Sequence, residues 1–422
     1  MFRNSGSPVS VSQLIPHAIL LATLFFAASV APSSAAEKPK VRTITAFIRL
    51  DTTQYKQQVA DTVKVLRNAK ARFDLAGYTV ETIRISTQPF PEYTRGMSKQ
   101  DTLAFFHDLD NLAKQEGFIV SIGPALMSEK DDPAQAQLLS DILSLTNKLS
   151  GSIVVAGDDG VHWKAVRAAA EVMKYLEDHT DQSLGNFRFA AIANVPAYTP
   201  FFPASFHQGL GHQFAIALES ANVVAAAMAV PRDAEATRQA IVAELGIHAR
   251  AVDDVANKLD RETGWAYMGL DLSPVPMKEV SIASATAGTT GGRFGTSGTL
   301  TAAATITSAL RDIMVKKLGY NGLMLPVLED TRLAQLWSEG ALTMDQILAY
   351  SAVCGTGLDT IPLPGDITTD HLARIIGDVA TLSAKLSKPL SARLLPLAGL
   401  KPGDRTMLDD PNLVNTVLQP LP

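Results

Sequence analysis

The sequence of 422 residues has a single cysteine, Cys354, so no disulfide can form within the chain. It also lacks basic runs with interleaved aromatic residues, and its formal net charge is −5. This charge argues against a surface for nucleic acid or for an acidic membrane. Hydrophobic residues make up 46% of the chain and charged residues 19%, which excludes a largely disordered protein and permits a large core.

Long apolar runs are confined to the N-terminus, where residues 14–31 are almost uncharged. The small residues Ser34 and Ala36 follow, as cleavage by signal peptidase requires. We therefore predict that residues 1–36 are a cleaved signal peptide, that Glu37 begins the mature chain, and that the protein is periplasmic or secreted. A retained anchor is the alternative, because the run approaches the roughly 20 residues of a spanning helix. No cysteine follows the run to carry a lipid, so we expect no stable membrane anchor after cleavage.

Strand and helix patterns alternate along the remaining chain. Residues 41–50 are rich in β-branched side chains and predict a strand, and residues 78–86 predict a second one. Between them, residues 55–73 repeat apolar side chains at steps of three and four, which predicts a helix. Further helices are predicted at residues 101–116, 133–149, 162–178, 232–260, 300–318, 331–349 and 369–387. Further strands are predicted at residues 118–122, 153–156, 187–193, 266–270, 323–328 and 392–397.

This repetition of βαβ units predicts an α/β fold with a mainly parallel sheet whose faces are covered by helices. No linker rich in proline, serine or charge divides the chain, so we predict one domain over residues 37–422. Functional groups of such folds gather where strands end. Asn194 and Asp271 directly follow predicted strands, and Glu329 with Asp330 follows another. Ordinary turns have the same composition, so each loop alone is a weak signal.

The segment around the only cysteine is the most distinctive candidate site. Gly355 and Gly357 follow Cys354 closely and permit a tight turn that could expose the sulfur to a ligand. A reactive thiolate would need a positive charge, hydrogen-bond donors or a helix N-terminus nearby. The alternative is a buried structural cysteine, which is a common fate of free thiols.

A glycine- and threonine-rich loop, residues 288–299, leads into a predicted helix. Its backbone N–H groups and the helix dipole suit a phosphate or carboxylate ligand, and an arginine could add a charged contact. The candidate ligand-binding residues of this loop are Gly291, Gly292, Arg293, Gly298 and Thr299. The loop matches neither a P-loop nor a dinucleotide fingerprint, so no cofactor is identified. A flexible helix cap is the alternative.

Metal binding has little support in the sequence. His207 and His212 are five residues apart, a poor spacing for two ligands on one helix face, and Glu219 is two turns further on. The acidic pairs Asp158–Asp159 and Glu329–Asp330 are typical of solvated turns or helix starts. We predict no metal site.

Several segments resemble the prokaryotic domain-of-unknown-function 711 family, which is also called the pyruvate formate-lyase-like family. The resemblance covers about residues 41–405. It is carried by residues 194–203, 218–221, 269–274, 322–327, 329–330, 353–354 and 357–359.

The resemblance implies that the βαβ units close into a barrel like that of glycyl-radical enzymes, in which strands surround a loop with a catalytic cysteine. Cys354 falls in the cysteine segment of the family. However, residues 393–422 contain no Arg-Val-Ser-Gly-Tyr-like loop, so glycyl-radical chemistry is not predicted.

Two functions follow from these patterns. The first is an enzyme that acts on a small polar or anionic metabolite through Cys354, with Asp271, Glu219 and Asp359 as supporting acids and the 288–299 loop and Asn194 as ligand contacts. The second is a periplasmic protein that binds a small ligand in the same cavity without catalysis. The sequence names neither the substrate nor the oligomeric state.

Overall fold

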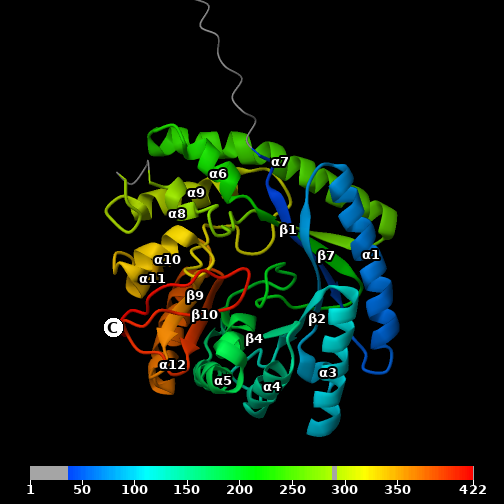
Figure 1. The fold of residues 1–422 in the computed structure, drawn as a ribbon. Helices are drawn as coiled ribbons and strands as arrows, with labels where there is room; N and C mark the ends of the chain where they lie inside the picture. The colour runs from blue at the N-terminus through cyan, green and yellow to red at the C-terminus, as the bar shows by residue number, and fades with distance from the viewer. Residues whose placement is uncertain (1–36, 288–291, 422) are drawn as a thin grey trace, which may run out of the picture. The chain divides into compact units, whose positions relative to one another are not determined.

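A mostly parallel sheet forms the centre of the computed structural model, which describes residues 37–287 and 292–421 (Figure 1). The strand order is β8-β7-β1-β2-β3-β4-β6-β10-β9, and β5 pairs with β4 at the side. The strands are β1 (Lys40–Ile48), β2 (Val80–Thr87), β3 (Ile119–Pro124), β4 (Leu149–Gly157), β5 (Gly160–Val161), β6 (Phe189–Ala193), β7 (Gln213–Glu219), β8 (Ala266–Asp271), β9 (Gly357–Pro364) and β10 (Leu390–Leu397). The predicted α/β class and the mainly parallel sheet are thus confirmed.

Helices cover the outer face of this sheet. In Figure 1, α1 and α3 lie outside β1 and β2, and α4, α5 and α12 lie outside β4 and its neighbours. The helices are α1 (Tyr55–Leu75), α2 (Phe90–Tyr93), α3 (Lys99–Glu116), α4 (Ala134–Leu145), α5 (Trp163–His179), η1 (Asp181–Arg188), α6 (Ala221–Met228), α7 (Ala234–Thr263), α8 (Ile282–Ala285), α9 (Thr299–Asp312), α10 (Thr331–Ser338), α11 (Met344–Ser351) and α12 (Thr369–Leu386). Within the ranges that the structure describes, we find no helix with the length and apolarity needed to cross a membrane. The predicted signal peptide lies outside the described residues.

Two antiparallel junctions divide the parallel strands into three groups. β1 pairs antiparallel with β7, and β10 pairs antiparallel with β6. Lys40 at the start of β1 therefore faces Glu219 at the end of β7. At each junction, the first residues of one strand therefore lie beside the last residues of the other strand.

Two predicted helices are shorter than their patterns indicated. The helix predicted at residues 331–349 is divided into α10 and α11, because Gly340 adopts a left-handed conformation with φ of 66°. The helix predicted at 300–318 ends at Asp312, because the following segment pairs with β8: Leu270 N donates to Lys316 O and Leu318 N donates to Leu270 O. Residues 323–328, which the sequence predicted as a strand, do not form one in the structure.

The long connection from β6 to β7, residues 194–212, crosses the inner face of the sheet. Thr45 Oγ1 of β1 donates to Pro200 O at 2.9 Å, and Ser121 Oγ of β3 donates to Ser205 O at 2.6 Å. His207 N donates to Thr87 O of β2. The contacts on β1 and β2 lie in the carboxyl-terminal halves of these strands and the contact on β3 lies near its middle, so the connection covers that part of the inner face.

A second segment spans the two edge strands of the sheet. Lys317 forms a parallel bridge with Leu270 of β8, and Pro326 forms a parallel bridge with Asp359 of β9. Residues 317–326 thus contact both edges. Regular strand pairing between β8 and β9 is not present among the described residues.

Candidate functional site

A pocket of about 330 Å³ opens on the inner face of the sheet, near the amino-terminal ends of the parallel strands. The strands contribute Arg42 of β1, Thr82 and Arg84 of β2, Ile119 of β3, Ser150 of β4, Ala190 of β6, Asp359 of β9, and Ser391 and Arg393 of β10. Loops add Phe201, Phe202, Tyr320, Met324 and Glu329. Residues 194–212 cover the neighbouring part of the inner face and supply Phe201 and Phe202 to the pocket wall.

Arg84 is the most unusual charge in the pocket. Strand alternation turns Thr82 and Arg84 to the same inner face, and the residue Arg84 is only 6% exposed. Its Nε donates to Thr82 Oγ1 at 3.1 Å, and its guanidinium carbon lies 5.0 Å from the ring centroid of Phe202. Among the described residues it forms no ion pair. Burial and the neighbouring guanidiniums of Arg42 and Arg393 lower the pKa of Arg84 to about 9.

Arg42, by contrast, is surrounded by carboxylates. Its Nη1 lies 2.8 Å from Glu81 Oε2 and 3.6 Å from Glu219 Oε2, and its Nη2 lies 4.0 Å from Glu329 Oε2. Lys40 also contacts Glu81 and Glu219. Burial and, to a lesser extent, the adjacent Glu81 together raise the pKa of Glu219 to about 7. The Arg42 charge is therefore balanced, unlike that of Arg84.

Arg393 joins two acids on the opposite wall. Its Nε donates to Asp359 Oδ1 at 2.6 Å, and its Nη2 donates to Glu329 Oε1. Burial raises the pKa of Glu329, although Arg393 opposes this shift. Desolvation lowers the pKa of Arg393, but both carboxylates more than reverse the effect and hold it above its ordinary value. This group is a fixed charge cluster that leaves one oxygen of Asp359 available to the pocket.

Hydroxyl groups line the same wall. Tyr320 OH and Ser391 Oγ form a hydrogen bond with each other. Thr356, immediately before β9, is 4% exposed, and its Oγ1 is buried without a hydrogen-bond partner. The wall therefore combines hydroxyl groups with the carboxylate of Asp359.

The pocket as a whole has more positive than negative side chains. Five cationic residues line it, namely Arg42, Arg84, Lys148, Arg188 and Arg393, against the three acids Glu329, Asp359 and Asp410. This excess stands out in a chain of net charge −5. A positively charged concave site concentrates anions from solution.

Four residues were predicted as catalytic: Cys354, Asp271, Glu219 and Asp359. Of these, only Asp359 lines the pocket. Glu219 lies behind it, in contact with the pocket residue Arg42. Asp271 is fully buried at the end of β8, where it accepts hydrogen bonds from Ser273 N, Tyr320 N and other donors. Its geometry is that of a structural carboxylate that holds the 319–321 turn against β8.

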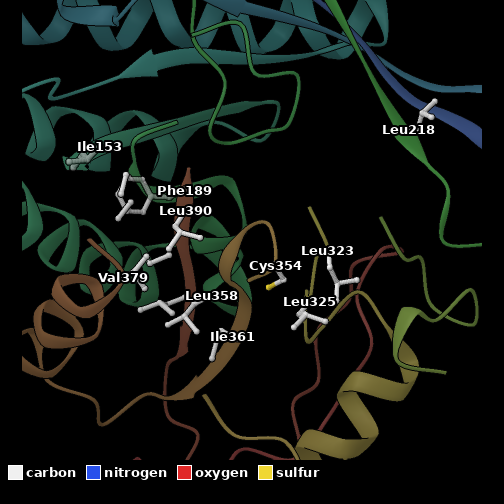
Figure 2. Packing of buried hydrophobic residues seen from close by; sticks show 14 of the residues in the cluster. Ile153, Phe189, Leu218, Leu323, Leu325, Cys354, Leu358, Ile361, Val379 and Leu390 are labelled. Atoms are coloured by element: carbon white, nitrogen blue, oxygen red, sulfur yellow. The ribbon is translucent and has the colours of Figure 1, made fainter. Parts of the chain in front are cut away.

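Cys354 is a core residue in the structure. It is 1% exposed, does not line the pocket, and lies near Leu323 and Leu325 (Figure 2). Burial raises the pKa of its thiol to about 11. The following glycines permit close backbone packing: Gly355 N donates to Leu323 O at 2.9 Å. The segment predicted from the sequence reaches the pocket through Thr356 and Asp359, and the placement of its thiol is that of the structural alternative.

The predicted ligand loop lies away from the pocket. Arg293 pairs with Glu339 of the α10–α11 connection at 2.9 Å, and Gly298 is the N-cap of α9 with φ of 97°. Thr299 Oγ1 accepts a hydrogen bond from Gly295 N. Gly292 also has a positive φ and does not line the pocket, and Gly291 lies outside the described residues. These contacts are those of a helix cap.

Asn194 and the two histidines also have partners of their own. Asn194 Nδ2 donates to Ser383 Oγ of α12 at 2.9 Å. His207 Nε2 lies 2.9 Å from Gln213 Oε1, and His212 stacks on Trp265. In residues 37–287 and 292–421, no group of three His, Cys, Asp or Glu side chains has the arrangement of a metal site.

The sequence reasoning missed the arginines of the pocket. Arg42, Arg84 and Arg393 each interrupt a strand that is otherwise rich in apolar and hydroxyl side chains. A charged residue in a strand covered on both faces needs a partner or a ligand. That pattern was visible in the sequence and is the signal that could have identified the site.

Comparison with known proteins places the chain in a family. The family model described as "Uncharacterised ACR (DUF711)" matches residues 34–409. A UPF0210 protein of Pyrobaculum aerophilum is 33% identical over 345 residues, which cover 78% of this chain and 76% of the relative. A UPF0210 protein of Listeria monocytogenes is 27% identical over 353 residues, with coverage of 78% and 76%. A UPF0210 protein of Methanopyrus kandleri is 29% identical over 287 residues, which cover 65% of this chain and 63% of the relative. The chain therefore belongs to the DUF711 family, as the resemblance in its sequence indicated.

Proposed function

We propose that this protein binds a small organic acid in the inner pocket and that Arg84 holds the carboxylate. The observation that carries this proposal is a buried guanidinium, 6% exposed, that lines the pocket and has no acidic partner among the described residues. A buried charge is strongly unfavourable unless it is paired. A planar guanidinium pairs with a carboxylate through two parallel hydrogen bonds, so a bound acid would supply the missing partner.

The volume and charge of the pocket support a small anionic ligand. A volume of about 330 Å³ is near the lower end of the range of ligand pockets, which suits a metabolite rather than a polymer. Apolar side chains such as Phe201 and Met324 complete the lining and exclude water from one side. Binding without catalysis is the function that this geometry supports best, because Cys354 does not line the pocket.

Two further features belong to the proposal. We take the bridges of residues 317–326 to both edge strands as support for a sheet that closes into a barrel around the pocket, as in the pyruvate formate-lyase-like fold. We also propose export, because the apolar run at 14–31 is followed by small residues. Intact-mass measurement on protein from its native host tests the second point, since a chain that still begins at Met1 would refute cleavage.

The central proposal is tested with propionate as the probe and the variant Arg84→Met. Isothermal titration of the wild-type protein should detect propionate binding. The variant should lose at least about 30-fold in affinity, because a charge-assisted pair contributes about 2 kcal/mol. Its thermal unfolding midpoint should equal or exceed that of the wild type, since a buried charge that is disfavoured in the apo protein has been removed.

The surface variant Arg67→Met is the matched control, because Arg67 pairs with Glu116 far from the pocket lining. It should leave propionate affinity unchanged. Undiminished binding by Arg84→Met would overturn the proposal, as would a wild-type protein that binds neither propionate nor other small carboxylates. If Arg84→Met does not fold, the wild-type titration and Arg84→Lys, which keeps the charge but not the planar fork, decide the question.

A further inference from the structure

We infer that the acid bound in the pocket is a small hydroxy acid, with a neutral hydroxyl group held by Thr356. This inference rests on the proposed function, because it assigns the part of the ligand that Arg84 does not hold. The observation that supports it is separate from the burial of Arg84. Thr356 lines the pocket, is 4% exposed, and has a buried Oγ1 without a hydrogen-bond partner.

The backbone contacts around Thr356 hold this residue at the pocket wall. Gly355 N donates to Leu323 O at 2.9 Å on one side, and Ser391 N donates to Thr356 O at 2.8 Å on the other. A Cβ on Gly355 would lie 2.6 Å from the carbonyl carbon of Gly322, so the two chain segments are in direct backbone contact. The backbone of Thr356 is thus held between two segments. Buried polar groups of proteins are otherwise nearly always hydrogen-bonded.

Groups of matching chemistry lie on the same wall of the pocket. Asp359 lines the pocket and uses Oδ1 for Arg393, which leaves Oδ2 as an acceptor. Tyr320 and Ser391 also line the pocket and are joined by a hydrogen bond. A ligand hydroxyl can donate to a carboxylate oxygen and accept from a threonine hydroxyl at the same time. The wall therefore suits a group that is both donor and acceptor.

The balance of charge favours a hydroxyl over an ammonium group at this position. Arg393 already pairs with both Asp359 and Glu329, and Arg42 approaches Glu329 as well. With Glu219 protonated, the four cations Lys40, Arg42, Arg84 and Arg393 exceed the carboxylates of Glu81, Glu329 and Asp359 by one positive charge, which a single ligand carboxylate neutralises. An added ammonium group would restore the excess, whereas a hydroxyl would not. The pocket thus fits a hydroxy acid better than an amino acid.

A site built to hydrogen bond a hydroxyl discriminates strongly against an analogue that lacks it, because its own polar groups are then left unpaired. Three probes of similar size separate the possibilities: glycerate, propionate and alanine. Wild-type protein should bind glycerate at least about 10-fold more tightly than propionate, and alanine more weakly than glycerate. Thr356→Val has nearly the same shape and lacks the hydroxyl. It should reduce glycerate affinity to about that of propionate, with propionate affinity unchanged.

The outcomes separate this inference from the proposed function. If propionate binds as tightly as glycerate, or if Thr356→Val leaves their ratio unchanged, the hydroxy-acid inference is wrong while carboxylate binding at Arg84 stands. If neither acid binds, the proposed function itself fails. Thr305→Val is the control, since Thr305 lies on α9 outside the pocket lining and should change no affinity. If Thr356→Val does not fold, the wild-type ratio and Thr356→Ser, which keeps the hydroxyl and should keep the ratio, decide the result.

Discussion

The carboxyl groups of Glu81 and Glu219 lie on the two strands that flank β1, and Lys40 and Arg42 of β1 contact both of them. Lys40 Nζ lies 3.0 Å from Glu81 Oε1 and 3.3 Å from Glu219 Oε1. Burial raises the pKa of Glu219 to about 7. Burial alone would raise the pKa of Glu81, but the neighbouring Glu219, Arg42 and Lys40 outweigh this effect and lower the pKa. The two groups therefore hold one proton between them near neutral pH.

This shared proton predicts a pH dependence of stability. Because the folded-state pKa of Glu219 lies above its ordinary value of 4.5, the folded protein binds the proton more tightly than the unfolded chain between these values. The contribution to the free energy of unfolding is present below about pH 4.5 and is lost as the pH rises to about 7, by about 3 kcal/mol. Urea unfolding of the wild type and of Glu219→Gln from pH 4.5 to 8 measures it.

The variant Glu219→Gln should be less dependent on pH across this window than the wild type. Other buried acids, including Glu329 and Asp271, also have raised pKa values, so the difference between the two proteins isolates Glu219. Glu81→Gln is the matched control, because it removes the like charge and should flatten the same window. An identical slope in wild type and Glu219→Gln would show that the pair shares no proton.

Much of the fold could be predicted from the sequence because its elements depend on local patterns. The β-branched run of β1 and the apolar period of α1 identified both elements within about two residues. Strand β9 was missed because it contains Pro362 and Pro364. Prolines are tolerated there because β9 is an edge strand of the sheet path and few of its N–H groups are needed for pairing.

The site was harder to predict because it depends on contacts between distant segments. The sequence directed attention to the carboxyl ends of the strands, where most α/β proteins bind ligands. Here residues 194–212 cover that part of the inner face, and nothing local in the sequence shows where so long a connection lies. Asp359 was identified from its segment, whereas Arg84 required knowledge of which strand face is inside. The side chains of a strand point alternately to the two faces of the sheet, but only the packing of the sheet decides which face lines the pocket.

Close backbone packing next to the pocket gives a second prediction. In Gly355→Ala, the new Cβ would lie 2.6 Å from the carbonyl carbon of Gly322 and 2.8 Å from its oxygen. Neither neighbour has a side chain that could move aside, so the two segments must separate. We expect a loss of about 3 kcal/mol in the free energy of unfolding, the upper part of the range for overpacking. Urea unfolding measures this loss.

Gly340→Ala provides the comparison, because its Cβ would meet no atom within 4 Å and only its φ of 66° opposes substitution. It should lose about 1 kcal/mol, the contribution of a left-handed conformation. If Gly355→Ala is no less stable than Gly340→Ala, the segments around Gly322 and Gly355 are not in the contact described, and the fixed position of Thr356 loses its support.

The last prediction concerns the thiol of Cys354, for which the sequence left two alternatives. The structure surrounds it with core residues and leaves it 1% exposed, and burial raises the pKa of the thiol to about 11. At pH 7 only about one molecule in 10,000 would then carry the thiolate, which is the nucleophile. We therefore expect iodoacetamide to alkylate Cys354 slowly in the native protein and rapidly after unfolding in urea, as followed by intact mass.

Substitution separates a structural thiol from a catalytic one. Cys354→Ser keeps nearly the same volume but places a more polar hydroxyl at a fully buried position among core residues, near Ser351 and Lys388, so the free energy of unfolding should fall by about 1–3 kcal/mol. The affinities for propionate and glycerate should not change, because the side chain does not line the pocket. A working thiol predicts the reverse pattern: rapid alkylation of the folded protein and an unchanged or higher stability, since functional groups are often held at the expense of stability. That pattern would return Cys354 to the site and require an open state in which the Leu323 and Thr356 segments separate and the hydrogen bond from Gly355 N to Leu323 O is broken.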